Sequence, residues 1–354
     1  MVREQEFLFS IDPATHTIYA SNQNRARIDV IDAATCNVRH LSGCKPVAHI
    51  PMPHKQANVG AIDHTTHTLY ASDPSGNTIS VINIAHCKAA DTTGCSSAAP
   101  TITVGPGPGS PVLDGATHTL YAPEGANDSN QVAVVNTAIC NAQHTSGCGQ
   151  TPATVTVAKG TFVIALSQAE DTVYAAGSGF GSPHLGHTVA VINGATCNGH
   201  NHSGCGHLAA TIKVGLAPVG LDVNDKTHTV YVANNADGDL PGTVSLIDSA
   251  TCNGSHTAGC AGAKPTAPVG RSPLLVAVDA ATDTAYVTNF SSASVSVLNG
   301  AKCRAGHTHA CAKAVREQPV GSQPFGLAID QATSSVYVGD TLAPAALSIF
   351  KTSP

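Results

Sequence analysis

The sequence predicts an all-β protein built from seven copies of one unit about fifty residues long, and three observations support this. The seven tyrosines recur at separations of 51, 51, 53, 57, 55 and 51 residues. The twelve cysteines form six pairs, each with seven residues between its members. Between these markers, short segments alternate Val, Ile, Thr or Tyr with polar residues and are bounded by Gly, Pro, Asn or Asp, which is typical of strands. The tyrosines are Tyr19, Tyr70, Tyr121, Tyr174, Tyr231, Tyr286 and Tyr337.

Aligning the copies on the tyrosine predicts four strands in each unit. The first is apolar and follows a Gly/Pro segment, as in residues 219–223, and the second surrounds the tyrosine, as in 229–233. The third alternates strongly, as in 243–247, and the fourth closes the unit, as in 154–157. No segment of helical length shows a 3.6-residue period.

Seven four-stranded meanders favour a closed ring, because an open array would need end repeats with a polar outer face and neither end has one. We therefore expect a seven-bladed β-propeller of four-stranded antiparallel blades. No linker or change in composition interrupts the repeat, so residues 1–354 are expected to form a single domain.

The seventh unit lacks a fourth strand and a cysteine pair, so the last blade is expected to be either incomplete or closed by the N-terminus. The N-terminal residues 2–5 repeat the letters Val-Arg-Glu-Gln of residues 315–318, which precede the expected fourth strand of unit six. However, Asp12 follows Arg3 by nine residues, whereas Asp330 follows Arg316 by fourteen, so the N-terminal connection is short.

The second strands of units five and six carry Tyr231-Val-Ala-Asn234 and Tyr286-Val-Thr-Asn289. These segments and the surrounding repeat resemble the YVTN family of β-propeller repeats over nearly the whole chain. The resemblance implies the fold and a bacterial secreted, periplasmic or surface-layer type of protein. Similar propellers include lactonases and lyases, so the resemblance does not select one activity.

The cysteine pairs flank the loop between the third and fourth strands of units one to six, where antiparallel strands bring opposed residues within disulfide range. Closing so short a loop stabilises the fold by roughly 2.5 kcal/mol on the chain-entropy model. We expect six local disulfides and an oxidising compartment: secreted, periplasmic or cell surface. The predicted pairs are Cys36 with Cys44, Cys87 with Cys95, Cys140 with Cys148, Cys197 with Cys205, Cys252 with Cys260 and Cys303 with Cys311.

Charge and hydropathy exclude several partners. Only 11% of the residues are charged and the net charge is −6, which disfavours nucleic acid as a partner. No apolar run is long enough to span a membrane, and the charged Arg3 and Glu4 so close to Met1 do not resemble a secretion leader.

Histidines are frequent in the predicted loops and suggest two places for a divalent metal ion. His200 and His202 lie in the disulfide loop of unit four, where two imidazoles could hold a metal weakly. The first turns of four units also carry a histidine, for which turn chemistry is the simpler explanation, because Asp, Asn and His tolerate a left-handed backbone. These turn histidines are His16, His67, His118 and His228.

The longest insertion in the repeat, residues 177–187, contains the pair His184 and His187. With Glu124 and Asp237 from neighbouring units, this pair could bind a divalent cation and act as a metal-assisted lyase or lactonase. We consider a non-enzymatic extracellular module that binds a protein, glycan or small ligand the better interpretation, because no catalytic motif is present. Self-association into a surface layer through an unpaired edge of the seventh unit is a third alternative.

Overall fold

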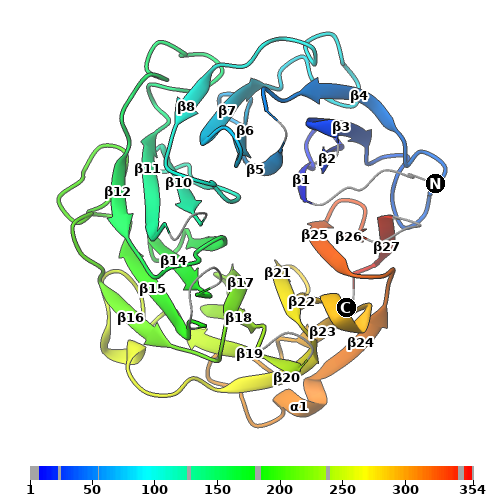
Figure 1. The fold of residues 1–354 in the computed structure, drawn as a ribbon. Helices are drawn as coiled ribbons and strands as arrows, with labels where there is room; N and C mark the ends of the chain where they lie inside the picture. The colour runs from blue at the N-terminus through cyan, green and yellow to red at the C-terminus, as the bar shows by residue number, and fades with distance from the viewer. Residues whose placement is uncertain are drawn as a thin grey trace.

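The computed structural model describes residues 8–22, 25–54, 56–125, 129–179, 185–236, 240–341 and 347–352. Seven antiparallel sheets are arranged in a ring, each sheet forming one blade (Figure 1). The prediction of an all-β, seven-bladed β-propeller is therefore confirmed. Six blades have four strands, and the seventh has three within the described residues. The N-terminal segment 2–5 lies outside those residues.

The strands follow the chain blade by blade. Blades 1 to 3 contain β1 (Phe9–Asp12), β2 (Thr17–Asn22), β3 (Arg27–Asp32), β4 (Pro46–Pro51), β5 (Asn58–Asp63), β6 (Thr68–Asp73), β7 (Thr78–Asn83), β8 (Thr101–Thr103), β9 (Val112–Asp114), β10 (Thr119–Glu124), β11 (Gln131–Asn136) and β12 (Ala153–Thr156). Blades 4 and 5 contain β13 (Ile164–Ser167), β14 (Thr172–Gly177), β15 (Thr188–Asn193), β16 (Ala210–Lys213), β17 (Pro218–Asn224), β18 (Thr229–Asn234), β19 (Pro241–Asp248) and β20 (Thr266–Arg271). Blades 6 and 7 contain β21 (Pro273–Asp279), β22 (Thr284–Asn289), β23 (Ser294–Asn299), β24 (Val315–Pro319), β25 (Pro324–Asp330), β26 (Ser335–Asp340) and β27 (Leu347–Lys351).

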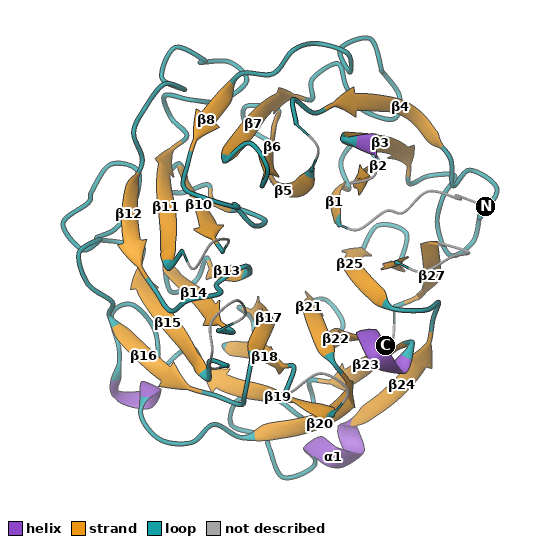
Figure 2. Ribbon diagram, in the orientation of Figure 1, coloured by secondary structure: helices purple, strands orange, loops and turns teal. Residues whose placement is uncertain are grey.

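Short helical turns interrupt the strands at three places named here. They are α1 (Cys311–Ala314), η2 (Ala258–Cys260) and η3 (Phe290–Ser292). Figure 2 shows α1 on the outer rim of the ring, just before β24. Because this turn leads directly into the outer edge, residues 315–318 form the fourth strand of blade 6 rather than preceding it. No helix in the described part of the chain is long and apolar enough to cross a membrane.

The sequence pattern of each strand follows its place in the blade. The first strand lies nearest the axis and the fourth on the rim (Figure 1). The second strand is buried along its whole length, because blades pack on both of its faces. The fourth strand alternates, so that in β8 Ile102 is buried between exposed Thr101 and Thr103.

The hydrophobic core is divided among the interfaces between neighbouring blades, which we call seams. One core cluster fills each of the seven seams, and the tyrosine of the preceding blade is buried in each. Six clusters also contain the disulfide of the following blade. The cluster between blades 6 and 7 contains none.

The first turns that follow the repeat have the chemistry that their sequence predicts. Asp12 Oδ1 accepts a hydrogen bond from the Ala14 N–H at 3.0 Å, and the His16 backbone has a φ of 50°. The left-handed conformation recurs at His67, His118 and His228, with φ of 53°, 49° and 50°. These turn histidines therefore have a structural explanation that requires no metal.

All six predicted disulfides are present, each within one hairpin. Their Cα–Cα distances lie between 4.5 and 4.8 Å. No described cysteine is free. The bonds join Cys36 to Cys44, Cys87 to Cys95, Cys140 to Cys148, Cys197 to Cys205, Cys252 to Cys260 and Cys303 to Cys311.

Candidate functional site

The two ends of the ring differ in regularity. In a four-stranded meander, the turn between the first two strands and the disulfide loop emerge at one end, which we call the disulfide face. The loops between the second and third strands, and the links from one blade to the next, emerge at the opposite end, which we call the irregular face. The disulfide face repeats the same contacts around the ring, whereas the irregular face differs from blade to blade.

On the disulfide face, each disulfide loop is bound to the preceding blade by two hydrogen bonds. The tyrosine hydroxyl of one blade donates to the carbonyl of the first cysteine of the next, as from Tyr121 to Cys197 at 2.7 Å. Two residues earlier, a threonine hydroxyl accepts a backbone N–H from the same loop, as Thr119 does from Gly199 at 2.7 Å. The tyrosine bond recurs from Tyr19 to Cys87, Tyr70 to Cys140, Tyr174 to Cys252, Tyr231 to Cys303 and Tyr337 to Cys36.

Burial keeps these tyrosine hydroxyls protonated, so that they can donate a hydrogen bond. Burial raises the pKa of the Tyr121 hydroxyl, and nearby Asp114 adds to the effect because a phenolate would be repelled by its charge. Burial likewise raises the pKa of Tyr337 to about 12. The tyrosine and cysteine repeats therefore form one device that connects the blades, a relation that the common spacing alone did not reveal.

On the irregular face, the residue that ends the second strand differs between blades and is buried. Asn234 donates to Ser245 Oγ at 2.9 Å, and Asn289 donates to Ser296 Oγ at 2.8 Å. In blade 7, Asp340 takes this position and accepts from Ser348 Oγ at 2.7 Å. The equivalent residues in the other blades are Asn22, Asp73, Glu124 and Gly177.

Asp340 should impose a pH dependence on stability. Burial raises its pKa to about 6, so the folded protein binds this proton more tightly than the unfolded chain does. The free energy of unfolding should therefore increase as the pH falls through about 6 and level off below the unfolded pKa near 4. Asp340→Asn, which copies blades 5 and 6, is expected to raise the free energy of unfolding at about pH 8 by about 1–3 kcal/mol.

Urea unfolding of both proteins at about pH 5 and about pH 8 measures this effect. The difference between the two pH values should be smaller in the Asp340→Asn variant. Equal pH dependence in the two proteins would contradict the assignment.

Four residues were predicted to form a catalytic site, and the structure describes only Glu124 and His187. Glu124 is buried at the end of β10, where its Oε1 accepts the Gly105 N–H at 2.8 Å, and a Cβ at position 105 would collide with its carboxylate. Burial raises the pKa of Glu124, and this hydrogen bond partly offsets the rise. His187 is exposed just before β15. His184 and Asp237 lie outside the described residues.

No group of three or more His, Cys, Asp or Glu side chains that could hold a metal ion occurs among the described residues. His200 and His202 are exposed in the disulfide loop of blade 4. A metal at either histidine pair, and the lyase or lactonase activity built on His184 and His187, therefore stay predictions.

A polar cluster joins blades 4 and 5 where their first turns depart from the repeat. The Ser167 hydroxyl contacts the carboxylates of Glu170 and Asp225, the latter at 2.7 Å. Glu170 also lies 2.6 Å from His228 Nδ1. The departures in these turns mark this cluster in the sequence, but only the ring geometry shows that they meet across a seam.

One carboxylate lies on an innermost strand away from the turns. Asp222 of β17 accepts the N–H of Val223 and, from the first strand of blade 6, the N–H of Val278, both at 2.8 Å. Burial raises the pKa of Asp222 to about 6. We assign it a structural role, because its hydrogen bonds connect two neighbouring inner strands.

Three exposed apolar side chains lie on the irregular face of blades 4 and 5. Phe162, Leu216 and Leu240 are 37%, 45% and 56% exposed, and they lie on the links into blades 4 and 5 and in the loop of blade 5. A backbone hydrogen bond connects the segments of Leu216 and Leu240, because the Ala236 N–H donates to the Leu216 carbonyl at 3.0 Å. The Phe162 ring lies beside Gly125 of blade 3, where a Cβ would collide with it. We call Phe162, Leu216 and Leu240 the apolar patch.

The fold and these surfaces define a disulfide-bonded, seven-bladed β-propeller. Its backbone is similar to a solved structure described as Kuenenia stuttgartiensis hydrazine synthase, with a TM-score of 0.73 and 13% sequence identity over 100% of this chain and 97% of that chain. At this identity the similarity shows the fold alone. No family model and no curated protein matches the sequence, so the YVTN resemblance stays a prediction.

Proposed function

We propose that the protein is an extracellular binding module that uses the apolar patch on its irregular face to hold a protein, glycan or small ligand. The observation that carries this proposal is that the exposed Leu216 and Leu240 lie on two segments joined by the hydrogen bond from Ala236 N–H to the Leu216 carbonyl, on the same face as Phe162. Single exposed apolar residues are normal on a protein surface, but neighbouring ones mark interaction sites. In this proposal, residues 1–354 form a single domain.

The disulfide face supports the proposal by providing a rigid frame. Six covalently closed loops, each bound to the preceding blade, hold the blades in fixed positions. Loops on such a frame can differ in sequence without loss of the fold. Because disulfides persist in oxidising surroundings, the protein is expected outside the cytosol.

The test compares ligand retention by two variants with substitutions at opposite ends of the ring. The double variant Leu216→Asp with Leu240→Asp places two charges in the apolar patch, whereas the control Leu41→Asp with Ile139→Asp changes exposed apolar residues of two disulfide loops. The immobilised proteins are exposed to a glycan array and to secreted protein from the source cells. We expect native protein and control to retain a ligand that the patch variant loses by about tenfold or more in affinity.

Equal retention by the patch variant and the control would contradict a binding site at the apolar patch. Thermal unfolding of both variants verifies that the substitutions leave the fold intact. A ligand retained only with an added divalent cation, and lost in His187→Ala, would instead favour the metal-dependent enzyme.

A further inference from the structure

A pocket of about 320 Å³ lies between the disulfide loops of blades 2 and 3, and we call it the blade 2 pocket. Its lining comes from the end of β7, from the segment that leads into β8, and from Ala142 and Thr145 of the next disulfide loop. Both disulfide loops lie wholly within the described residues. Because Asn83 and Ser97 of the lining are exposed, a ligand can enter the pocket from outside the ring.

In blade 3, the corresponding place is filled by a glutamine side chain. Gln150 Oε1 accepts the Asn136 N–H at 2.9 Å, and Gln150 Nε2 donates to the Asn136 carbonyl at 3.0 Å. Asn136 ends the third strand beyond the last residue that pairs with the fourth strand, so the glutamine satisfies both main-chain groups of an uncovered edge. Blade 2 has Ser97 instead, since Ser97 and Gln150 each follow the second cysteine of their pair by two residues.

Asn83 is the blade 2 equivalent of Asn136, because each lies opposite the first threonine of the second strand. In β7, the Val81 N–H donates outward to the Pro100 carbonyl at 2.8 Å. Residues two apart in an antiparallel strand direct their main-chain groups to the same side, so those of Asn83 also point outward. None of the described residues donates to the Asn83 carbonyl or accepts the Asn83 N–H on this side.

The carbonyl distinguishes blade 2 from the other complete blades. In blades 1, 4, 5 and 6, the N–H of the first cysteine donates to the equivalent carbonyl at 2.8 to 2.9 Å, and in blade 3 the glutamine does so. In blade 2, the Cys87 N–H donates to the Ile84 carbonyl at 3.4 Å instead. Among the complete blades, blade 2 therefore has both a vacant place for a side chain and an unsatisfied pair of main-chain groups beside it.

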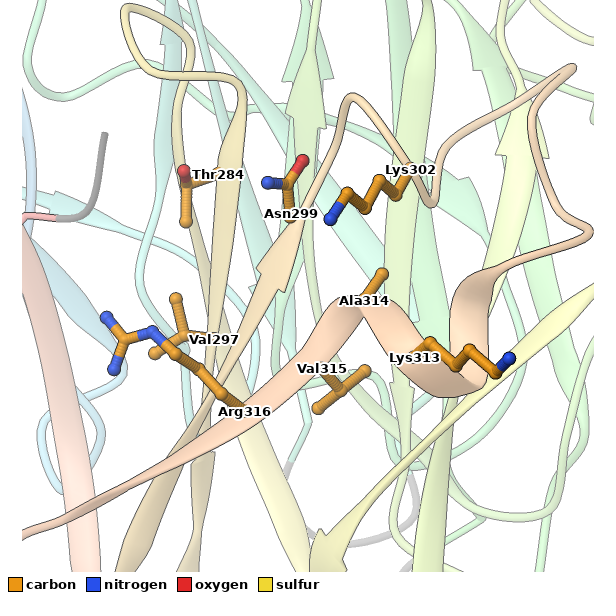
Figure 3. Close-up of a pocket in the computed structure, with 8 residues that line it drawn as sticks. All are labelled: Thr284, Val297, Asn299, Lys302, Lys313, Ala314, Val315 and Arg316. Atoms are coloured by element: carbon orange, nitrogen blue, oxygen red, sulfur yellow. The ribbon is translucent and has the colours of Figure 1, made fainter.

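The lining of the blade 2 pocket favours a neutral ligand. No Lys, Arg, Asp or Glu is among the described residues that line it, and the Nδ1 of its only histidine, His86, lies 2.8 Å from Asp91 Oδ2. The corresponding cavity of blade 6, of about 190 Å³, is instead lined by Lys302, Lys313 and Arg316 (Figure 3). Apolar contact in the blade 2 pocket comes from Val81, Ile82, Ala98, Ala99 and Pro100.

The N–H and carbonyl of Asn83 select the chemical group that can bind. Both lie on one side of the strand, so a ligand must present an acceptor and a donor side by side. A primary carboxamide does this, as Gln150 shows in blade 3. The secondary amide of a peptide backbone or of an acetylated amino sugar is trans, so its carbonyl and N–H point in opposite directions. A carboxylate only accepts, and would face the Asn83 carbonyl.

We propose that the blade 2 pocket is a binding site for the side-chain carboxamide of a glutamine in a partner protein. The carboxamide would accept the Asn83 N–H and donate to the Asn83 carbonyl, and the glutamine would take the place that Gln150 takes in blade 3. Free glutamine carries two charges for which the lining has no counter-charge, whereas a glutamine within a chain carries none. This site is separate from the apolar patch and does not depend on it.

The test is a selection from a random peptide library displayed on phage, with the full native protein as bait. The library is first depleted on the Ser97→Gln variant, which places in blade 2 the side chain that fills blade 3. Selected peptides should share a glutamine, and their affinity should fall by about tenfold or more in Ser97→Gln. The matched control Ser203→Gln makes the same change at an exposed loop serine of blade 4 and should bind as the native protein does.

A second variant blocks the pocket without a carboxamide. Ala98→Leu copies blade 4, where Leu208 at the equivalent position packs against the core of the seam, and it should lower peptide affinity by a similar factor. In the peptide, replacing the shared glutamine by glutamate removes the donor and should also lower affinity by about tenfold or more. Bound peptide should slow hydrogen exchange of the Asn83 N–H. Thermal unfolding verifies that each variant is folded.

Three results would overturn the proposal. The selected peptides could lack glutamine, or they could bind Ser97→Gln as tightly as they bind the native protein. Third, benzamide, a small primary carboxamide, could bind as tightly as the peptides, which would assign the pocket to a small molecule rather than to a partner protein.

Discussion

Replacing Cys140 and Cys148 together by alanine is expected to lower the free energy of unfolding by about 2–5 kcal/mol. The disulfide closes a loop with a Cα–Cα distance of 4.7 Å, and its removal lets the unfolded chain gain conformational freedom. The change also loosens the disulfide loop of blade 3, which is hydrogen-bonded to Tyr70 and Thr68 of blade 2. Contacts of the folded state are therefore weakened as well.

Urea unfolding followed by circular dichroism measures this change. Labelling with a thiol-specific alkylator provides the control, because the native protein should take no label until it is reduced. A variant as stable as the native protein, or twelve labels on unreduced protein, would contradict the role assigned to the disulfides.

Replacing Tyr121 is expected to have a comparable effect that separates packing from hydrogen bonding. Tyr121 is fully buried in the core between blades 3 and 4 and donates to the Cys197 carbonyl at 2.7 Å. Tyr121→Phe removes only the donor and should cost about 1–3 kcal/mol, whereas Tyr121→Ala also leaves a cavity and should cost about 3–5 kcal/mol.

The same unfolding measurement on both variants tests this order. If Tyr121→Phe is as stable as the native protein, the hydroxyl does not hold the next blade and the tyrosine acts through packing alone. In that case, replacing Cys197 and Cys205 by alanine should lower the free energy of unfolding by the same amount with Tyr121 or with Tyr121→Phe. If the hydroxyl and the disulfide loop are coupled, the two losses should not add.

The fold could be predicted from the sequence because the repeat is local. Each blade is formed by about fifty consecutive residues, and each cysteine pair lies within a single hairpin. The period of the repeat and the alternation of apolar residues were therefore sufficient to predict the blades. The signals also extended to backbone detail, since the left-handed turn at His16 and its equivalents was expected from the residue type.

Contacts between blades were not predictable in the same way. Tyr121 and Cys197 are 76 residues apart, and their common period does not show which blades they join. A signal was nevertheless present, because a threonine or serine stands two residues before every tyrosine. The cluster of Ser167, Glu170 and Asp225 could have been found as a departure from the repeat at equivalent positions.

The predicted site on the irregular face depended on loops of unequal length, for which the repeat supplies no geometry. Glu124 illustrates the difficulty, since its carboxylate binds the Gly105 backbone of the preceding link. Sequence position placed it near the insertion at 177–187, but its buried hydrogen bond could not be seen without coordinates.

The contacts on the disulfide face also determine how the two chain ends are held. In a ring of blades, no peptide link joins the first blade to the last, so the junction between them would ordinarily be the weakest. Here Tyr337 and Ser335 of the last blade bind the Cys36 loop of the first at 2.7 and 3.0 Å, as their equivalents do at five of the internal junctions. Blade 7 is therefore attached to blade 1 by these two hydrogen bonds. It is attached to blade 6 by the polypeptide link, an apolar contact surface and the hydrogen bond that Gln331 Nε2 donates to Asp279 Oδ1 at 3.1 Å.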